Sequence, residues 1–146
     1  MEVLFKENGY NVISITSSSV ITDECSEIVY VYNVIKSEYY FKIEYYNDSY
    51  FKINNRYIYK HTIIETLNDI VSDYDKTINY INKILKKRSV RYFWKMSFYG
   101  IFLIINNKIL INCDIINNEL FYTLNNKDYY KTINKSNILE CLKDIH

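Results

Sequence analysis

The stretch TIIETLNDIVSDY, Thr62 to Tyr74, decides the fold, because a related stretch, NILECLKDIH, returns at Asn137 to His146. Thr62–Ile70 aligns without a gap with Asn137–Ile145, and the two share Ile, Glu, Leu, Asp and Ile at matching positions. In both, apolar residues recur three and four apart, the spacing that places them on one face of an α-helix. We therefore predict two helices that arose from one ancestral segment.

Both predicted helices carry a start signal. Thr62 and Glu65 have the spacing of a capping box, in which the first side chain accepts from the amide three residues on. Asn137 and Glu140 repeat that spacing. Apolar residues continue past Tyr74 at helical intervals, so the first helix is predicted from position 62 to about 87, with a break near 73–75 as the alternative.

The match extends upstream of the helices. Tyr50–Asn55 corresponds to Phe121–Asn126, and the second copy has four extra residues near Ile133–Ser136. This order of strand, turn and helix is typical of an internal repeat. We interpret residues 1–146 as a single domain that contains a first ββββα repeat at 27–74, a helix continuation and basic-aromatic junction at 75–97, and a second ββββα repeat at 98–146.

Alternating apolar residues and Asn- or Asp-containing turns predict the strands. The first repeat has them at Ile28–Ile35, Tyr39–Tyr46, Tyr50–Ile53 and Arg56–Lys60, and the second at Phe98–Ile105, Lys108–Ile116, Glu119–Leu124 and Lys127–Ile133. Asn8-Gly9 predicts an N-terminal hairpin between Val3–Lys6 and Tyr10–Thr16. The predicted class is α+β, a tandem duplication of an antiparallel β-meander followed by a helix, with an N-terminal β-hairpin.

The phase of the strands predicts how their faces are used. In Tyr39–Tyr46 one face is apolar and is expected under helix 62–74, whereas the other mixes Tyr with Lys and Glu. Phe98–Ile105 is apolar on both faces and needs cover on both sides. Either the C-terminal half of the long helix supplies that cover or a second copy of the chain does, so a homodimer is predicted as one alternative.

Composition limits the broad class of protein. The chain has 49% hydrophobic and 17% aromatic residues, enough for a core, and no apolar run of membrane-spanning length. The formal net charge of +1 gives no global attraction for nucleic acid. Three cysteines without C-x-x-C spacing predict reduced, buried thiols and a cytoplasmic location. Ala and Pro, whose codons are GC-rich, are absent, which indicates an AT-rich genome such as that of many phages and viruses.

Catalytic motifs are missing from the sequence. Two glycines cannot build a P-loop, a G-x-G-x-x-G turn or a G-x-S-x-G elbow. His61 precedes a helix start and His146 is the last residue of the sequence, so neither is interpreted as a catalytic base. Acidic residues gather at Asp23, Glu24 and Glu27 and at Asp69, Asp73 and Asp75. These are interpreted as solvated side chains, so no enzyme activity, cofactor or metal is predicted; a metal-dependent hydrolase is kept as an alternative.

Two groups of residues are candidate binding sites. In the segment KILKKRSVRYFWK, positions 83–95, basic residues attract phosphates and flat rings stack on unpaired bases. The alternative is that the basic residues complement the helix C-terminus and the rings open the next strand. The second group is the tyrosines on the outer sheet face, whose rings suit protein partners. The candidate residues are Lys86, Lys87, Arg88, Arg91, Tyr92 and Trp94 in the segment and Tyr40, Tyr46, Tyr57 and Tyr59 on the sheet.

Ser49–Tyr74, SYFKINNRYIYKHTIIETLNDIVSDY, resembles the last strands and helix of an SH2 domain, where T-L-x-x-L-V-x-x-Y is common. The strand FYGIFLII, Phe98–Ile105, is similar to the phosphate-binding strand of that family but lacks its required Arg and follows the helix. The sequence therefore predicts no phosphotyrosine binding.

The functional hypothesis is a small non-enzymatic binding protein. We expect a phage- or virus-encoded inhibitor that contacts a host protein, for example a component of antiviral or CRISPR defence, in the host cytoplasm and away from membranes. A nucleic-acid-binding protein that uses segment 83–95 is the main alternative.

Overall fold

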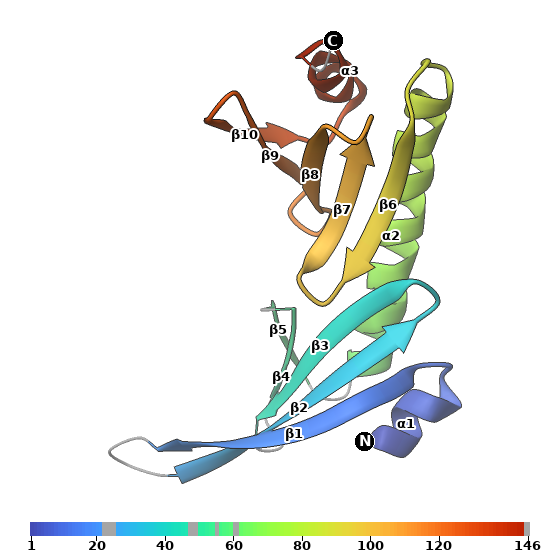
Figure 1. The fold of residues 1–146 in the computed structure, drawn as a ribbon. Coiled ribbons are helices and arrows are strands. Elements are labelled where there is room, and N and C mark those ends of the chain that lie inside the picture. Colours follow the sequence, from blue (N-terminus) through green and yellow to red (C-terminus); the bar gives the residue numbers. More distant parts are fainter. Residues whose placement is uncertain (22–25, 47–49, 55, 60–61, 145–146) are drawn as a thin grey trace. The chain divides into compact units, whose positions relative to one another are not determined.

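The computed structural model describes residues 1–21, 26–46, 50–54, 56–59 and 62–144. Two antiparallel sheets of five strands follow one another along the chain, and each is followed by a helix (Figure 1). In both sheets each strand pairs with its neighbour in sequence, which is the order of a meander. The predicted α+β class with tandem meander sheets and a C-terminal helix is confirmed.

The chain divides into two compact units, Met1–Asp69 and Ile70–His146, with the boundary inside one long helix. The first unit contains α1 (Glu2–Glu7), β1 (Asn11–Ile21), β2 (Ser26–Lys36), β3 (Tyr39–Tyr46), β4 (Tyr50–Ile53), β5 (Arg56–Tyr59) and the start of α2 (Ile63–Lys86). The second contains the rest of α2, β6 (Tyr92–Ser97), β7 (Gly100–Ile105), β8 (Ile109–Asp114), β9 (Glu119–Leu124), β10 (Lys127–Thr132) and α3 (Lys135–Asp144).

Each sheet has a fifth strand outside the predicted repeats. β1 lies before residue 27 and β6 lies before residue 98. β6 is formed by the aromatic part of the junction segment, YFWKMS, in which the exposed Phe93 and Lys95 alternate with the half-buried Tyr92, Trp94 and Met96. Both units therefore share the order of five strands and a helix, while the origin of that order in a duplication stays a prediction.

Asparagines make the turns between strands. Asn54 and Asn125, the pair that the repeat alignment superimposes, both adopt left-handed backbone, with φ of 46° and 52°. Asn tolerates this region because its short side chain can bond locally. Further turns in the second unit use the same conformation at Asn106, Asn107, Asn118 and Asn126. The abundance of Asn in the chain thus has a structural use.

The prediction of a hairpin around Asn8-Gly9 is wrong, because Glu2–Glu7 forms helix α1. Gly9 has φ of +82°, and its amide donates to the carbonyl of Lys6. A left-handed glycine ends a helix as readily as it turns a hairpin, so the dipeptide alone does not distinguish them. Phe5 of α1 is fully buried, and its ring lies 5.7 Å from that of Tyr32.

The core of the first unit lies on one face of its sheet. β3 alternates as predicted: Tyr39, Phe41 and Ile43 are buried, while Lys42 is exposed. The register pairs Val34 with Phe41, so β2 adds to the same layer. Ile63 and Leu67 of α2 and Phe51, Ile53 and Ile58 of the sheet are buried with them. Val29 of β2 is also buried, although it pairs with Tyr46 on the opposite face.

Tyr10 joins the N-terminal segment to α2. Its ring is 1% exposed, and its hydroxyl donates a hydrogen bond of 2.8 Å to Asn68 Oδ1. Burial raises the pKa of Tyr10 to about 12. Lys36 Nζ lies 4.4 Å from the centre of the same ring and donates a hydrogen bond to the carbonyl of Asn8. One lysine therefore contacts both Tyr10 and the C-terminal end of α1.

Helix α2 runs continuously from Ile63 to Lys86, so the helix predicted over 62–87 is confirmed and the alternative break near 73–75 is wrong. The apolar seam predicted along it is Leu67, Val71, Tyr74, Ile78, Ile81 and Leu85; all of these are buried except Val71, which is half-buried beside the buried Ile70. An unbroken helix is expected because that seam has no Gly or Pro within it.

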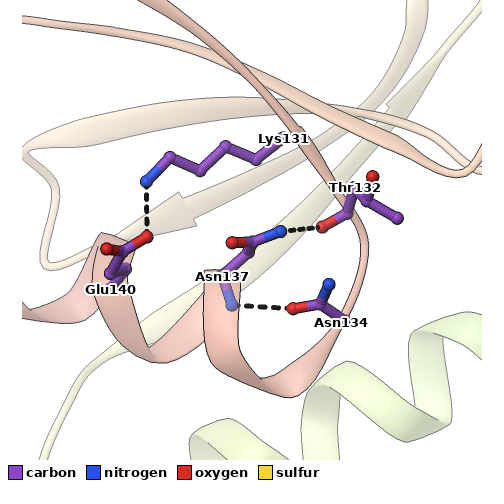
Figure 2. Close-up of polar contacts among 5 residues, drawn as sticks. All are labelled: Lys131, Thr132, Asn134, Asn137 and Glu140. Carbon is purple, nitrogen blue, oxygen red and sulfur yellow. Dashed lines mark hydrogen bonds and ion pairs between the residues drawn. The ribbon is translucent and has the colours of Figure 1, made fainter.

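The start of α3 differs from the prediction. The helix begins at Lys135, and the amide of Asn137 donates to Asn134 Oδ1 at 2.8 Å, so Asn134 is the cap (Figure 2). Asn137 Nδ2 instead donates to the carbonyl of Thr132, and Glu140 pairs with Lys131. The capping box predicted at Asn137 and Glu140 is therefore wrong, because the four extra residues supply an earlier asparagine and an added first turn.

Candidate binding surfaces

The outer face of the first sheet carries the predicted tyrosines. We call it the tyrosine face and define it by Tyr40, Lys42, Glu44, Tyr46, Lys52 and Tyr57 with their neighbours in register. The register places Tyr46, Tyr50 and Tyr59 in one row across β3, β4 and β5, and Glu44, Lys52 and Tyr57 in the next. Because alternate residues of a strand share a face, Tyr40, Tyr46 and Tyr57 belong to this one, and Tyr59 has the matching register position in β5.

Charged side chains accompany these rings. Tyr57 is 67% exposed, and Lys52 Nζ lies 5.2 Å from its ring centre. Lys42 Nζ lies 3.8 Å from Glu44 Oε1 on the same face. Tyr40 and Tyr46 are half-buried, and the side chains of Tyr50 and Tyr59 lie outside those that the structure describes. The face thus combines flat aromatic area with both signs of charge.

The basic segment lies where α2 ends and β6 begins. Lys86, Lys87, Arg88 and Arg91 are all exposed. Two hydrogen bonds with Asn106 fix the backbone of Arg91. The amide of Asn106 donates to the carbonyl of Arg91, and the amide of Arg91 donates to Asn106 Oδ1. The predicted basic residues are therefore brought together at one connection, with their charges in solvent.

The rings of the same segment are split between two faces. Trp94 pairs in register with Leu103, a buried residue, and its indole N–H donates to Asn82 Oδ1 of α2 at 2.8 Å. By alternation Tyr92 lies on that helix-covered side too, and both rings are half-buried. Phe93 faces the opposite side and is 50% exposed. The segment therefore does not offer a single platform of adjacent rings.

One face of the second sheet is covered by helices. Trp94 approaches α2 through Asn82, and Lys131 approaches α3 through Glu140 at 2.8 Å. The register links these positions through one buried layer, which contains Ile101, Leu103, Ile105, Ile109, Ile111, Cys113, Leu120 and Tyr122. Both helices therefore lie on the same side of this sheet.

The opposite face of the second sheet is apolar and faces solvent. We call it the apolar face after the apolar side chains it carries, Phe93, Phe102, Ile104, Leu110, Phe121 and Tyr130. The register places polar residues on the same face, namely Lys95, Asn112, Asp114, Glu119, Thr123 and Asp128. The register sets Phe93, Ile104 and Leu110 in one row across β6, β7 and β8. A second row contains Lys95, Phe102, Asn112, Phe121 and Tyr130 and crosses all five strands.

Within the second unit, neither α2 nor α3 covers this apolar face. Leu110 is 53% exposed and Tyr130 70%, and the rings of Phe121 and Tyr130 lie 4.6 Å apart. A depression of about 350 Å³ opens beside Phe102, Leu110 and Phe121. The prediction that the C-terminal half of the long helix would cover this side is wrong, since α2 lies on the other. Sequence reasoning predicted the need for cover but did not single out Phe102, Leu110 or Phe121 as a surface.

Cysteine thiols and possible metal ligands are further candidate sites. Cys113 and Cys141 are buried thiols that belong to no disulfide, as predicted, and burial raises the pKa of Cys113 to about 12. Within the described ranges, no three His, Cys, Asp or Glu side chains are placed to hold a metal ion. Cys25, His61, His146 and the acidic side chains at positions 23, 24 and 27 lie outside what the structure describes.

No helix among the described residues is long and apolar enough to cross a membrane. Comparison with models of protein families, with curated proteins and with solved structures gave no match.

Proposed function

We propose that this chain is a small non-enzymatic protein that binds another protein through the tyrosine face. The observation that carries the proposal is the register of β3, β4 and β5, which gathers the tyrosines with Lys42, Glu44 and Lys52 on one side of the sheet. The opposite side of the same sheet is the buried core. On this face Tyr57 and Lys42 are exposed, whereas Val29, in register with Tyr46, is buried.

The chemistry of this face suits a protein partner. Tyrosine gives large contact area for little loss of side-chain entropy, and its hydroxyl tolerates both water and a hydrogen-bond partner. Tyr57 under Lys52 has a partly fixed ring, which lowers the cost of ordering it on binding. Charges of both signs around the rings favour one orientation of the partner.

The partner we propose is a host protein, and the chain is a phage- or virus-encoded inhibitor that acts in the host cytoplasm. This part of the proposal is supported by the short chain and by a composition that lacks Ala and Pro. A component of antiviral or CRISPR defence is the kind of target we propose. Binding of a second copy of the chain is a separate proposal, which involves the second sheet and not the tyrosine face.

A capture experiment with matched variants tests the tyrosine face. Tagged wild-type protein, Tyr57→Ala and Tyr99→Ala are each incubated with lysate of the native host, and bound proteins are quantified by mass spectrometry. Tyr99, 92% exposed in the turn between β6 and β7, is the control for loss of an exposed ring. We expect a host protein that Tyr57→Ala loses by about tenfold or more and Tyr99→Ala retains. A partner retained equally by both variants would contradict the proposal.

Nucleic-acid binding is the second candidate, and the exposed basic residues at the α2–β6 connection support it. It predicts retention on single-stranded DNA or RNA at low salt that falls steeply as salt rises. Replacing Lys87 and Arg88 with Ala should remove this retention, whereas the tyrosine-face variant should not. Trp94→Ala adds little information here, because its indole is already bonded to Asn82.

A further inference from the structure

We propose that the apolar face of the second sheet binds the same face of a second copy of this chain. This inference does not depend on the tyrosine face, which belongs to the first unit. It starts from the six apolar side chains that cross all five strands there and from the fact that α2 and α3 both lie on the other side.

Size makes a face-to-face pair reasonable. Strands ~4.8 Å apart and residues ~3.4 Å apart give five strands of six residues a face of roughly 500 Å² in projection. Two such faces together reach the ~1,000 Å² that a biological interface needs, and fall below the ~1,600 Å² of a standard one. We therefore expect a reversible dimer with a Kd on the order of 10 µM.

The charges on this face select a second copy as the occupant. Lys108 lies at the start of β8 beside the depression, and Asp114 ends the same strand. Both are exposed, and Asp114 accepts hydrogen bonds from the amide and the side chain of Asn117, which fix its carboxylate. The two charges on one strand are opposite in sign and lie about 20 Å apart, beyond each other's reach.

A two-fold axis in the interface, perpendicular to the strands, makes these charges complementary. It places β8 antiparallel to β8 of the second copy, so Lys108 of each chain faces Asp114 of the other. The same axis sets Phe102 against Ile104 of the second copy in both directions, and it sets Leu110 against Asn112 and Phe93 against Lys95, so apolar and polar side chains alternate around the central Phe102–Ile104 contacts. Stacked sheets pack about 10 Å apart with strands nearly aligned, which this arrangement satisfies.

Sedimentation over a concentration series tests the surface. Wild type should double in mass across concentrations around 10 µM, and Leu110→Lys should weaken the dimer by at least about tenfold because it places a charge in the apolar row. Ile28→Lys, at an equally exposed strand residue of the first unit (51% against 53%), should leave the dimer intact. Circular dichroism checks that each variant is folded, and Lys108→Glu, which opposes two acids, is the second weakening variant.

Zero-length carbodiimide coupling tests the two-fold arrangement. It joins a lysine amine to a carboxylate only at contact, so a peptide that links Lys108 to Asp114 must come from two chains. Lys108→Arg keeps the charge but cannot be coupled, and should retain the dimer while losing that peptide. A dimer without the linked peptide would overturn the arrangement, and a dimer that tolerates Leu110→Lys would overturn the surface. A wild type that stays monomeric at about 1 mM overturns the proposal and leaves this face to a different protein.

Discussion

β3 of the first sheet turns Tyr40, Lys42 and Glu44 away from its core, whereas β7 of the second sheet turns Phe102 and Ile104 away from its own. The two sheets share strand number, antiparallel meander order and a following helix. Their buried faces are both apolar, and their outer faces differ in the side chains that they carry. One side of each sheet forms the core of its unit, while the other sides differ in chemistry, with tyrosines and charges in the first unit and more apolar side chains in the second.

The largest expected effect tests whether the buried sides are equivalent. Phe41→Ala in the first unit and Leu103→Ala in the second should each lower the free energy of unfolding by about 3–5 kcal/mol, because both side chains are fully or almost fully buried. Lys42→Ala, next to Phe41 but facing outward, should change it by less than about 1 kcal/mol. Urea denaturation measures all three, and an equal loss for Phe41→Ala and Lys42→Ala would contradict the assignment of faces.

A smaller effect is expected at the start of α3, where the two units differ locally. Asn134→Ala should lower stability by about 1 kcal/mol, because it removes the acceptor for the amide of Asn137. Asn137→Ala keeps that cap and loses only the bond to the carbonyl of Thr132, so its effect should be smaller. Thermal unfolding of the two variants compares them directly. If Asn137→Ala were the more damaging, the cap would lie at the position that the repeat alignment predicts.

The smallest effect concerns the contact between β10 and α3. Hydrogen bonding to Lys131 lowers the pKa of Glu140 below its ordinary value. A depressed folded-state pKa adds stability above the unfolded pKa, and this is lost as pH falls through the folded value. Glu140→Gln should therefore be slightly less stable than wild type near neutral pH and equal to it in strong acid. Because the pair is exposed, added salt should shrink the difference. A difference that persists unchanged in acid would contradict this pairing.

Much of the architecture follows from alternation and periodicity. β3, β4 and β9 have the bounds that the sequence predicts, and α2 follows its apolar seam. Asn8-Gly9 misleads because a left-handed glycine serves a helix end and a hairpin equally. β6 is predicted only as an alternative, because its three consecutive aromatic residues also fit a binding segment, and the cap of α3 is ambiguous because Asn134 and Asn137 both fit.

The candidate surfaces are predicted less completely. Alternation alone places Tyr40 and Tyr46 together, since it requires only one strand. Adding Tyr57 to the same face requires the register between three strands, which the sequence suggests through its short turns. The pattern of Phe98–Ile105 indicates that both faces of this strand are apolar, but it does not predict which face α2 packs against. That choice depends on packing at Trp94 and Asn82, two residues that periodicity does not connect.

The most direct test of the claim that the two uncovered faces differ is an NMR dilution series on the intact chain. Amide and methyl resonances are followed from about 1 mM to about 1 µM, a range that spans the expected Kd. We predict concentration-dependent shifts at Phe102, Leu110 and Phe121 of the apolar face and none at Tyr40 or Tyr57. Shifts on the tyrosine face, or no shifts in either unit, would contradict the account.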